Sequence, residues 1–148
     1  MAGNASPAVL WGSIRLASVL MGSQRIEPDG IAPPAASYAH AVLSKHCGRI
    51  LHTSGVVPIA PDGLVPTDVA EQAAVVWSNI SAILTEASMG PADIVSVVTY
   101  VVVGEDLGSV MTARDSALEG NLVASTLVYV PSLAQPAWKV EVAVVAIA

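Results

Sequence analysis

The sequence predicts an α+β domain with two helices on one face of a sheet. The chain has 148 residues, a length that suits one domain with a real core. Two helical patterns are embedded among several short apolar runs, an order typical of α+β domains. Hydrophobic residues make up 53% of the chain and charged residues only 12%. Such a composition leaves more apolar surface than a small monomer hides, so we expect a second copy of the chain against the other sheet face.

The first half of the chain contains two predicted strands and a loop. Residues 38–43 and 49–54 are short apolar runs, and Gly55 ends the second one. Residues 58–66 hold three prolines and an Asp-Gly pair, which predicts a loop. Residues 1–24 are interpreted as an N-terminal extension that packs on the body, and residues 25–148 as the domain itself.

A long helix is predicted from Asp68 to Ala87. Its apolar residues recur every three or four positions, and they are Val69, Ala73, Val76, Trp77, Ile80, Ile83, Leu84 and Ala87. Asp68 followed by Glu71 is typical of a helix N-terminus, and Gly90-Pro91 marks a stop.

The second half of the chain contains three predicted strands and a shorter helix. Residues 94–103 are almost entirely β-branched and predict a strand with both faces covered. Residues 107–118 predict the second, more polar helix. Residues 124–130 and 138–146 predict the last two strands.

Charge and composition exclude several classes of function. A net charge of −6 argues against nucleic-acid binding, which depends largely on Lys and Arg contacts to phosphates. A single cysteine, Cys47, forms no intrachain disulfide. No convincing membrane span or signal peptide is present, so we expect a cytoplasmic protein. No metal or cofactor motif is present, and His40, His46 and His52 are interpreted as surface or rim residues.

Several polar residues leave two interpretations open. Glu141 is a lone carboxylate on an apolar strand, either a general base or the partner of a basic residue from a neighbouring strand or subunit. Gly55 either lets backbone approach a ligand or serves an unusual turn. Arg114 and Asp115 are interpreted as a solvated helix face, and Cys47 as a buried or turn residue rather than a nucleophile.

Taken together, several segments resemble the Rid (YjgF/YER057c) family of imine deaminases, formerly called L-PSP endoribonucleases. The resemblance covers nearly four-fifths of the chain, from about residue 31 to the end. The segments that carry it are Tyr38-Ala39-His40-Ala41-Val42, Leu51-His52-Thr53-Ser54-Gly55-Val56-Val57-Pro58, Gln72 to Leu84 with its Asn79-Ile80 and Ile83-Leu84, Asp93-Ile94-Val95 with Thr99-Tyr100-Val101, Ala124-Ser125-Thr126-Leu127-Val128-Tyr129-Val130 and Leu133-Ala134-Gln135-Pro136-Ala137-Trp138-Lys139-Val140-Glu141-Val142.

The resemblance implies a chorismate-mutase-like fold with a mixed sheet and a homotrimer whose sheets form a central barrel. It also implies three clefts between subunits, each binding a small imine or enamine that carries a carboxylate. In the family an arginine grips that carboxylate and an acidic residue positions the hydrolytic water. No cofactor is implied.

Carried over by position, the resemblance assigns Tyr38, Ser54 and Gly55 to the cleft lining. The remaining matched positions differ in chemistry from the family pattern. The clamp arginine falls on Ser125, the family's cysteine on Leu127, the asparagine of the second helix on Met111 and the water-positioning acid on Ala143. A hydroxyl does not replace the charge of a guanidinium, so the cleft is expected to be more apolar than in the family.

These assignments leave three hypotheses for function. The first is a trimer that transforms an imine, enamine or related small molecule, with Glu141 and Ser125 as catalytic candidates. Its other binding residues would be Tyr38, Ser54, Gly55, Met111, Thr126 and Leu127. The second is a trimer that binds a small ligand or regulates without catalysis. The third, a ribonuclease or translation inhibitor, is disfavoured by the acidic composition.

Overall fold

The computed structural model describes residues 22–26, 28, 34–45 and 47–148. In chain order the elements are β1 (Gly22–Ile26), β2 (Ala41–Lys45), β3 (Ile50–His52), α1 (Val69–Glu86), a 3-10 turn (Pro91–Asp93), β4 (Ile94–Val102), α2 (Leu107–Leu118), β5 (Ala124–Val130) and β6 (Val140–Ile147). Most of the expected extension over residues 1–24 lies outside the described residues. No helix among the described residues is long and apolar enough to cross a membrane.

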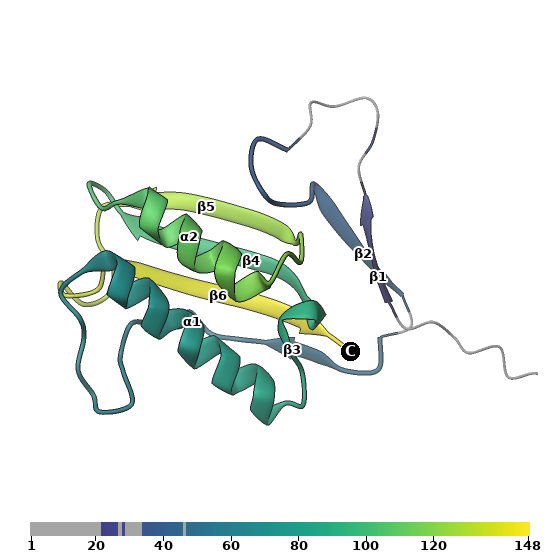
Figure 1. Cartoon of the computed structure of the whole chain (residues 1–148), viewed down its shortest axis with the longest axis horizontal. Helices are drawn as coiled ribbons and strands as arrows, with labels where there is room; N and C mark the ends of the chain where they lie inside the picture. Colours follow the sequence, from purple (N-terminus) through teal and green to yellow (C-terminus); the bar gives the residue numbers. More distant parts are fainter. Residues whose placement is uncertain (1–21, 27, 29–33, 46) are drawn as a thin grey trace, which may run out of the picture.

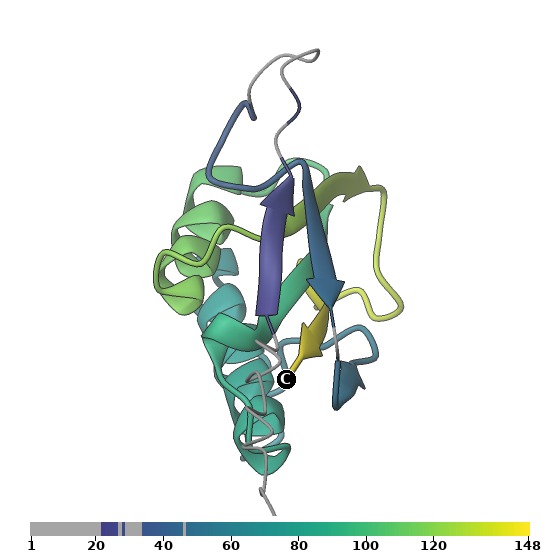
Figure 2. The same cartoon turned by 90° about the vertical axis from the view of Figure 1, so that its right-hand side faces the viewer.

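Four strands form one mixed sheet in the order β3-β6-β4-β5. β4 pairs with β5 in parallel, whereas β6 runs antiparallel to both β3 and β4. Both helices lie on the same side of this sheet, as Figures 1 and 2 show from two directions. The predicted α+β class, with two helices on one sheet face, is therefore confirmed.

The strands β1 and β2 form a separate antiparallel hairpin beside the sheet (Figure 1). The sequence did not predict β1, and it placed the next strand at residues 38–43 instead of Ala41–Lys45. The segment Gly22–Ile26 lacks the alternation of a half-buried strand. Cross-strand pairing supplies its order, including a hydrogen bond of 3.2 Å between the hydroxyls of Ser23 and Ser44.

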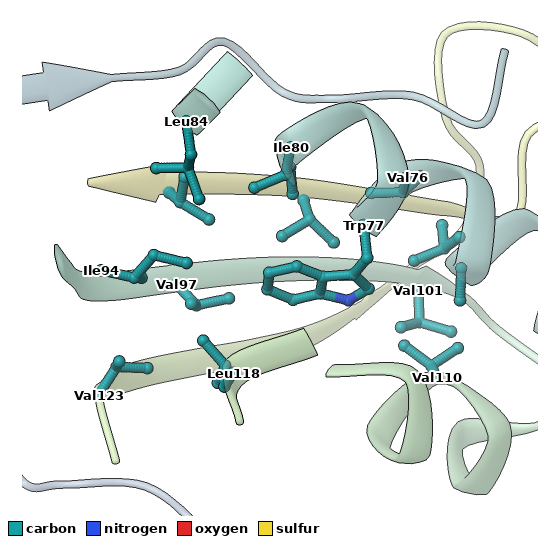
Figure 3. Packing of buried hydrophobic residues seen from close by; sticks show 14 of the residues in the cluster. Val76, Trp77, Ile80, Leu84, Ile94, Val97, Val101, Val110, Leu118 and Val123 are labelled. Carbon is teal, nitrogen blue, oxygen red and sulfur yellow. The ribbon is translucent and has the colours of Figure 1, made fainter. Parts of the chain in front are cut away.

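The core lies between the helices and the sheet. The apolar stripe of α1 packs on alternate residues of β4 and β6, and Figure 3 shows the Trp77 ring lying among these side chains. The predicted stripe is confirmed for its buried members, whereas Ile83 is 38% exposed. Fully buried positions of the core include Val76, Ile80, Val97, Val101, Val110, Val140 and Val142.

The other sheet face is largely apolar, and none of the described helices covers it. Side chains of β4 and β6 on this face, such as Val98 and Ala143, are half-buried. Val128 of β5 is 40% exposed and Ile50 of β3 57% exposed. The sequence predicted that both faces of β4 are covered. The helices cover one face, and the other stays half-buried. We call the uncovered side the open face.

The helix ends are capped by named side chains. Asp68 accepts hydrogen bonds from the N–H groups of Ala70 and Glu71, which confirms the predicted start of α1. At the other end, Arg49 donates to the carbonyls of Ala87 (2.7 Å) and Ser88 (3.3 Å). At the start of α2, hydrogen bonds from the Ser109 hydroxyl and then the Gly108 N–H lower the pKa of Asp106.

A fully buried glutamine ties α1 to the start of β6. Gln72 Nε2 donates to the carbonyls of Pro66 (2.7 Å) and Ala137 (2.8 Å), and its Oε1 accepts from the N–H of Lys139 (2.8 Å). These bonds satisfy backbone groups in two irregular segments that have no sheet or helix partner there.

The substitution Gln72→Met should lower the free energy of unfolding by about 2–4 kcal/mol, because methionine fills the space but leaves three backbone groups without a partner. Urea denaturation followed by circular dichroism measures this loss. The matched control is Glu71→Met on the same helical turn, where the side chain is exposed and the expected change is below about 0.5 kcal/mol. Equal stability of the two variants would show that the Gln72 bonds contribute little.

Candidate functional site

The predicted site residues fall on opposite faces of the sheet. Leu127 of β5 packs against the core and Ser125 lies beside α2, so both face the helices. Thr126, between them, points to the open face. Glu141 of β6 also lies on the open face, next to Tyr100 of β4. One chain therefore brings Glu141 and Ser125 to different surfaces.

On the open face, the Glu141 carboxylate lies directly against Gly55. Two backbone hydrogen bonds between Val56 and Val142, of 2.7 and 3.1 Å, hold the segment after β3 alongside β6. A Cβ added to Gly55 would overlap Oε1 of Glu141 and lie 2.6 Å from its Cδ. Ser54, beside Gly55, is exposed. The carboxylate thus occupies the volume that a side chain at position 55 would need.

Gly55 is required for space rather than for an unusual turn. The described glycines with positive φ are Gly63, Gly104 and Gly120, so the turn interpretation of Gly55 is wrong. No hydrogen bond or ion pair to the Glu141 carboxylate is found within the described part of the chain. The half-buried acid is therefore oriented by close packing, with its oxygens left for a ligand or another subunit.

On the helix side, the interpretation of Arg114 as a solvated residue is wrong. Its side chain is only 4% exposed, whereas that of the adjacent Asp115 is 47% exposed. Arg114 lies four residues after Val110 and four before Leu118, both buried, so it belongs to the inward stripe of α2. That spacing was the sequence signal that could have placed it.

The Arg114 guanidinium lies beside Ser125 of the same chain. Nη1 donates to Ser125 Oγ at 3.4 Å and Nη2 to the Ser37 carbonyl at 3.4 Å. Nε and Nη2 also donate to Asp115 Oδ1, at 2.9 and 2.7 Å. A helix therefore places a guanidinium beside position 125, which argues against the expected apolar character of the cleft at this position.

Two more predicted residues lie near this group. Tyr38 follows Ser37, and the N–H of Ala39 bonds the Val123 carbonyl at 2.8 Å, which fixes this segment beside the start of β5. The Tyr38 ring meets His40 edge-on, with centroids 6.2 Å apart. Met111 is half-buried on α2, one turn before Arg114.

A cavity of about 380 Å³ lies elsewhere, between the hairpin and the body. Its lining includes Arg25, Lys45, Asp93 and Asn121, and none of the predicted site residues. Cys47 also borders this cavity. It is exposed, so the expectation of burial is wrong, and it lies in a connecting segment outside the helices and strands. Among the described residues, no group of three His, Cys, Asp or Glu side chains is arranged to hold a metal ion.

Comparison with known proteins identifies relatives of this arrangement. A family model described as Endoribonuclease L-PSP matches residues 30–148. The structure of YyfB from Yersinia pestis, a Rid-family protein of unknown function, has 28% identity and a TM-score of 0.78, over 86% of this chain and 100% of that one. The YjgF gene product of E. coli has 26% identity and a TM-score of 0.63, over 84% and 98%.

The structure of E. coli TdcF with bound serine shares the fold, at 22% identity and a TM-score of 0.63 over 84% of this chain and 98% of that one. No protein with curated function matches.

The contact between Gly55 and Glu141 predicts a coupled pair. Gly55→Ala should destabilise the protein by about 1–2 kcal/mol, because the new methyl group must displace the carboxylate. In a Glu141→Ala background the same change should cost at least about 1 kcal/mol less. Thermal unfolding of the four proteins of this cycle measures the coupling.

Gly90→Ala is the matched control for Gly55→Ala, since a Cβ there meets nothing within 4 Å. Additive effects at positions 55 and 141 would contradict the packing described here.

Proposed function

Because the chain belongs to the endoribonuclease L-PSP family, also called the Rid family, we propose that it is a homotrimer that binds small imines, enamines or related reactive metabolites and promotes their hydrolysis. The clefts lie between subunits and the protein is cytoplasmic. TdcF, which has the same fold, holds serine, so the fold accommodates a ligand of amino-acid size. The activity differs from archetypal 2-aminoacrylate deamination, since Ser125 and Ala143 replace the arginine and the acid of the family pattern.

The placement of Glu141 carries this proposal. Its carboxylate is half-buried, oriented against Gly55 and not engaged by another side chain within the described residues. Such a group can accept a proton from water while the water oxygen attacks the imine carbon. The C=N bond becomes the C–N bond of a carbinolamine, whose nitrogen takes the proton held by Glu141. The hydroxyl proton then passes to the same nitrogen as the C–N bond breaks, so a carbonyl compound and an amine or ammonia are released.

Two subunits are needed to complete the proposed cleft. Glu141, Gly55 and Thr126 lie at the open face, whereas Ser125 lies on the opposite side of the edge strand β5. Only an approach of the open face of one subunit to the β5 edge of the next brings both groups to one ligand. Ser54 and Tyr38 would then provide polar contacts, and Met111 and Leu127 apolar ones.

A second candidate function is ligand binding or regulation without catalysis. Ala143 favours it, because the resemblance places the water-positioning acid there. Ribonuclease activity is disfavoured by the net charge of −6.

Hydrolysis assays separate the two candidates. The protein is mixed with a panel of small imines, with and without a carboxylate, and with 2-aminoacrylate generated in situ, and carbonyl release is timed. We expect acceleration of at least one panel member, a smaller effect on 2-aminoacrylate, and a loss of about 100-fold or more in Glu141→Gln. The double variant Ser125→Ala, Glu141→Ala is the blank for contaminating activity. Absence of acceleration across the panel would favour the binding function.

The trimer is tested by a charge on the open face. Analytical ultracentrifugation of the wild type should give three times the mass of the chain. Val128→Asp should give a smaller species, because the subunit contact would bury the new aspartate carboxylate away from water. The control is Leu64→Asp, at a loop residue that is 68% exposed and away from the sheet, which should remain trimeric. A monomeric wild type would refute the assembly.

A further inference from the structure

We propose that the cavity between the hairpin and the body binds a small phosphate ester whose other end carries an amino group. This site is separate from the proposed cleft. Ile147 and Ala148 line the cavity at the end of β6, whereas Glu141 lies near the start of that strand, about 20 Å away along it. The inference therefore goes beyond the proposed function and does not depend on hydrolysis at Glu141.

The cavity has two walls that belong to different parts of the fold. Arg25 and Val42 are directly opposite each other in the hairpin and both line the cavity, so the hairpin face that carries them points at the body. The other wall is formed by the 3-10 turn, the loop after α2 and the end of β6, which lies close to the hairpin in Figures 1 and 2. The cavity volume of about 380 Å³ suits a small molecule.

Charges of opposite sign line the two walls without meeting. Arg25 and Lys45 belong to the hairpin, and Asp93 belongs to the body. Within the described residues none of the three forms an ion pair, so the cavity keeps the two cations apart from the acid. Such an arrangement is complementary to a ligand with a negative group at one end and a positive group at the other.

The hairpin wall determines the chemistry of the negative end. The Arg25 guanidinium offers paired N–H donors to two oxygens of one group, and the Lys45 ammonium adds a second positive charge. A phosphate monoester carries a charge of about −1.5 to −2 at pH 7, so it matches two cations better than a carboxylate does. Both side chains are exposed, so a ligand can reach them from solvent.

The body wall presents acceptors to the other end of the ligand. Asp93 Oδ2 accepts a hydrogen bond from the Gly90 N–H at 2.8 Å, which orients the carboxylate and leaves Oδ1 without a partner among the described residues. Asn121 Nδ2 donates to the carbonyls of Pro91 and Ile94, both at 2.9 Å, so the amide oxygen remains as an acceptor. A protonated amino group has the donors and the charge that these oxygens require.

The test compares ligands that differ in one group at a time, by NMR titration of the full chain. Phosphoethanolamine has both groups, ethyl phosphate lacks the amine, ethanolamine lacks the phosphate, and β-alanine has a carboxylate in place of the phosphate. We expect phosphoethanolamine to bind at least about tenfold more tightly than the other three, with shifts at the amides of Ser23 and Leu122 on the two walls. Equal affinity for β-alanine, absence of binding, or shifts confined to other parts of the chain would overturn the proposal.

Variants of the two walls assign the ligand's ends. Arg25→Gln and Lys45→Gln should each weaken phosphoethanolamine binding about tenfold, and both side chains are exposed, so these variants should fold. Asp93→Asn should weaken phosphoethanolamine binding while ethyl phosphate binds as well as before or better, because the lost charge attracts the amine and repels the phosphate.

Lys139→Gln is the control for net charge, because Lys139 precedes the opposite end of β6 and pairs with Glu105 at 3.2 Å. It should leave phosphoethanolamine affinity unchanged. A loss in this control as large as in Arg25→Gln would show a nonspecific charge effect and refute the site. The same holds if Asp93→Asn changes the binding of phosphoethanolamine and ethyl phosphate alike.

Discussion

The structure depends on a sheet that is apolar on both faces but covered by helices on only one. Valines of β4 and β6 that face α1 and α2 are fully buried and form the core, whereas the valines and alanines between them remain half-buried. Burial of the first set fixes the register of every strand, because a shift of one residue would exchange the two sets. The second set, fixed in turn, gives a largely apolar surface that no helix covers. Glu141 belongs to that second set and places a carboxylate on this otherwise largely apolar surface.

The periodic elements could be predicted from the sequence, and the non-periodic ones could not. The helix over 107–118 and the strand over 124–130 coincide with α2 and β5, because their apolar patterns and flanking residues mark both ends. The strand β1 has no such pattern and depends on pairing with β2. The role of Gln72 could not be predicted either, because its side chain bonds three backbone groups of segments that are distant in the sequence.

For the candidate site, the sequence identified residues but not their contacts. It singled out both Gly55 and Glu141, yet the reason for the glycine is the carboxylate packed against it. It interpreted Arg114 as solvated because charged residues in a polar helix usually are, although the four-residue spacing from Val110 and Leu118 places it inward. It identified Ser125 as a neutral residue at the position where the resemblance expects an arginine. Only the fold shows that α2 places the Arg114 guanidinium beside this serine.

The separation of Glu141 and Ser125 onto opposite sides of the sheet has a genetic consequence under the proposed assembly. Each cleft would draw its acid from one polypeptide and its hydroxyl from the next. Two alleles, one defective in each residue, would then complement each other when co-expressed, since mixed oligomers contain junctions where both intact groups meet. A subunit defective in both residues would instead inactivate both clefts to which it contributes. The activity left in a heterozygous cell would then depend on how the two kinds of subunit mix within each oligomer.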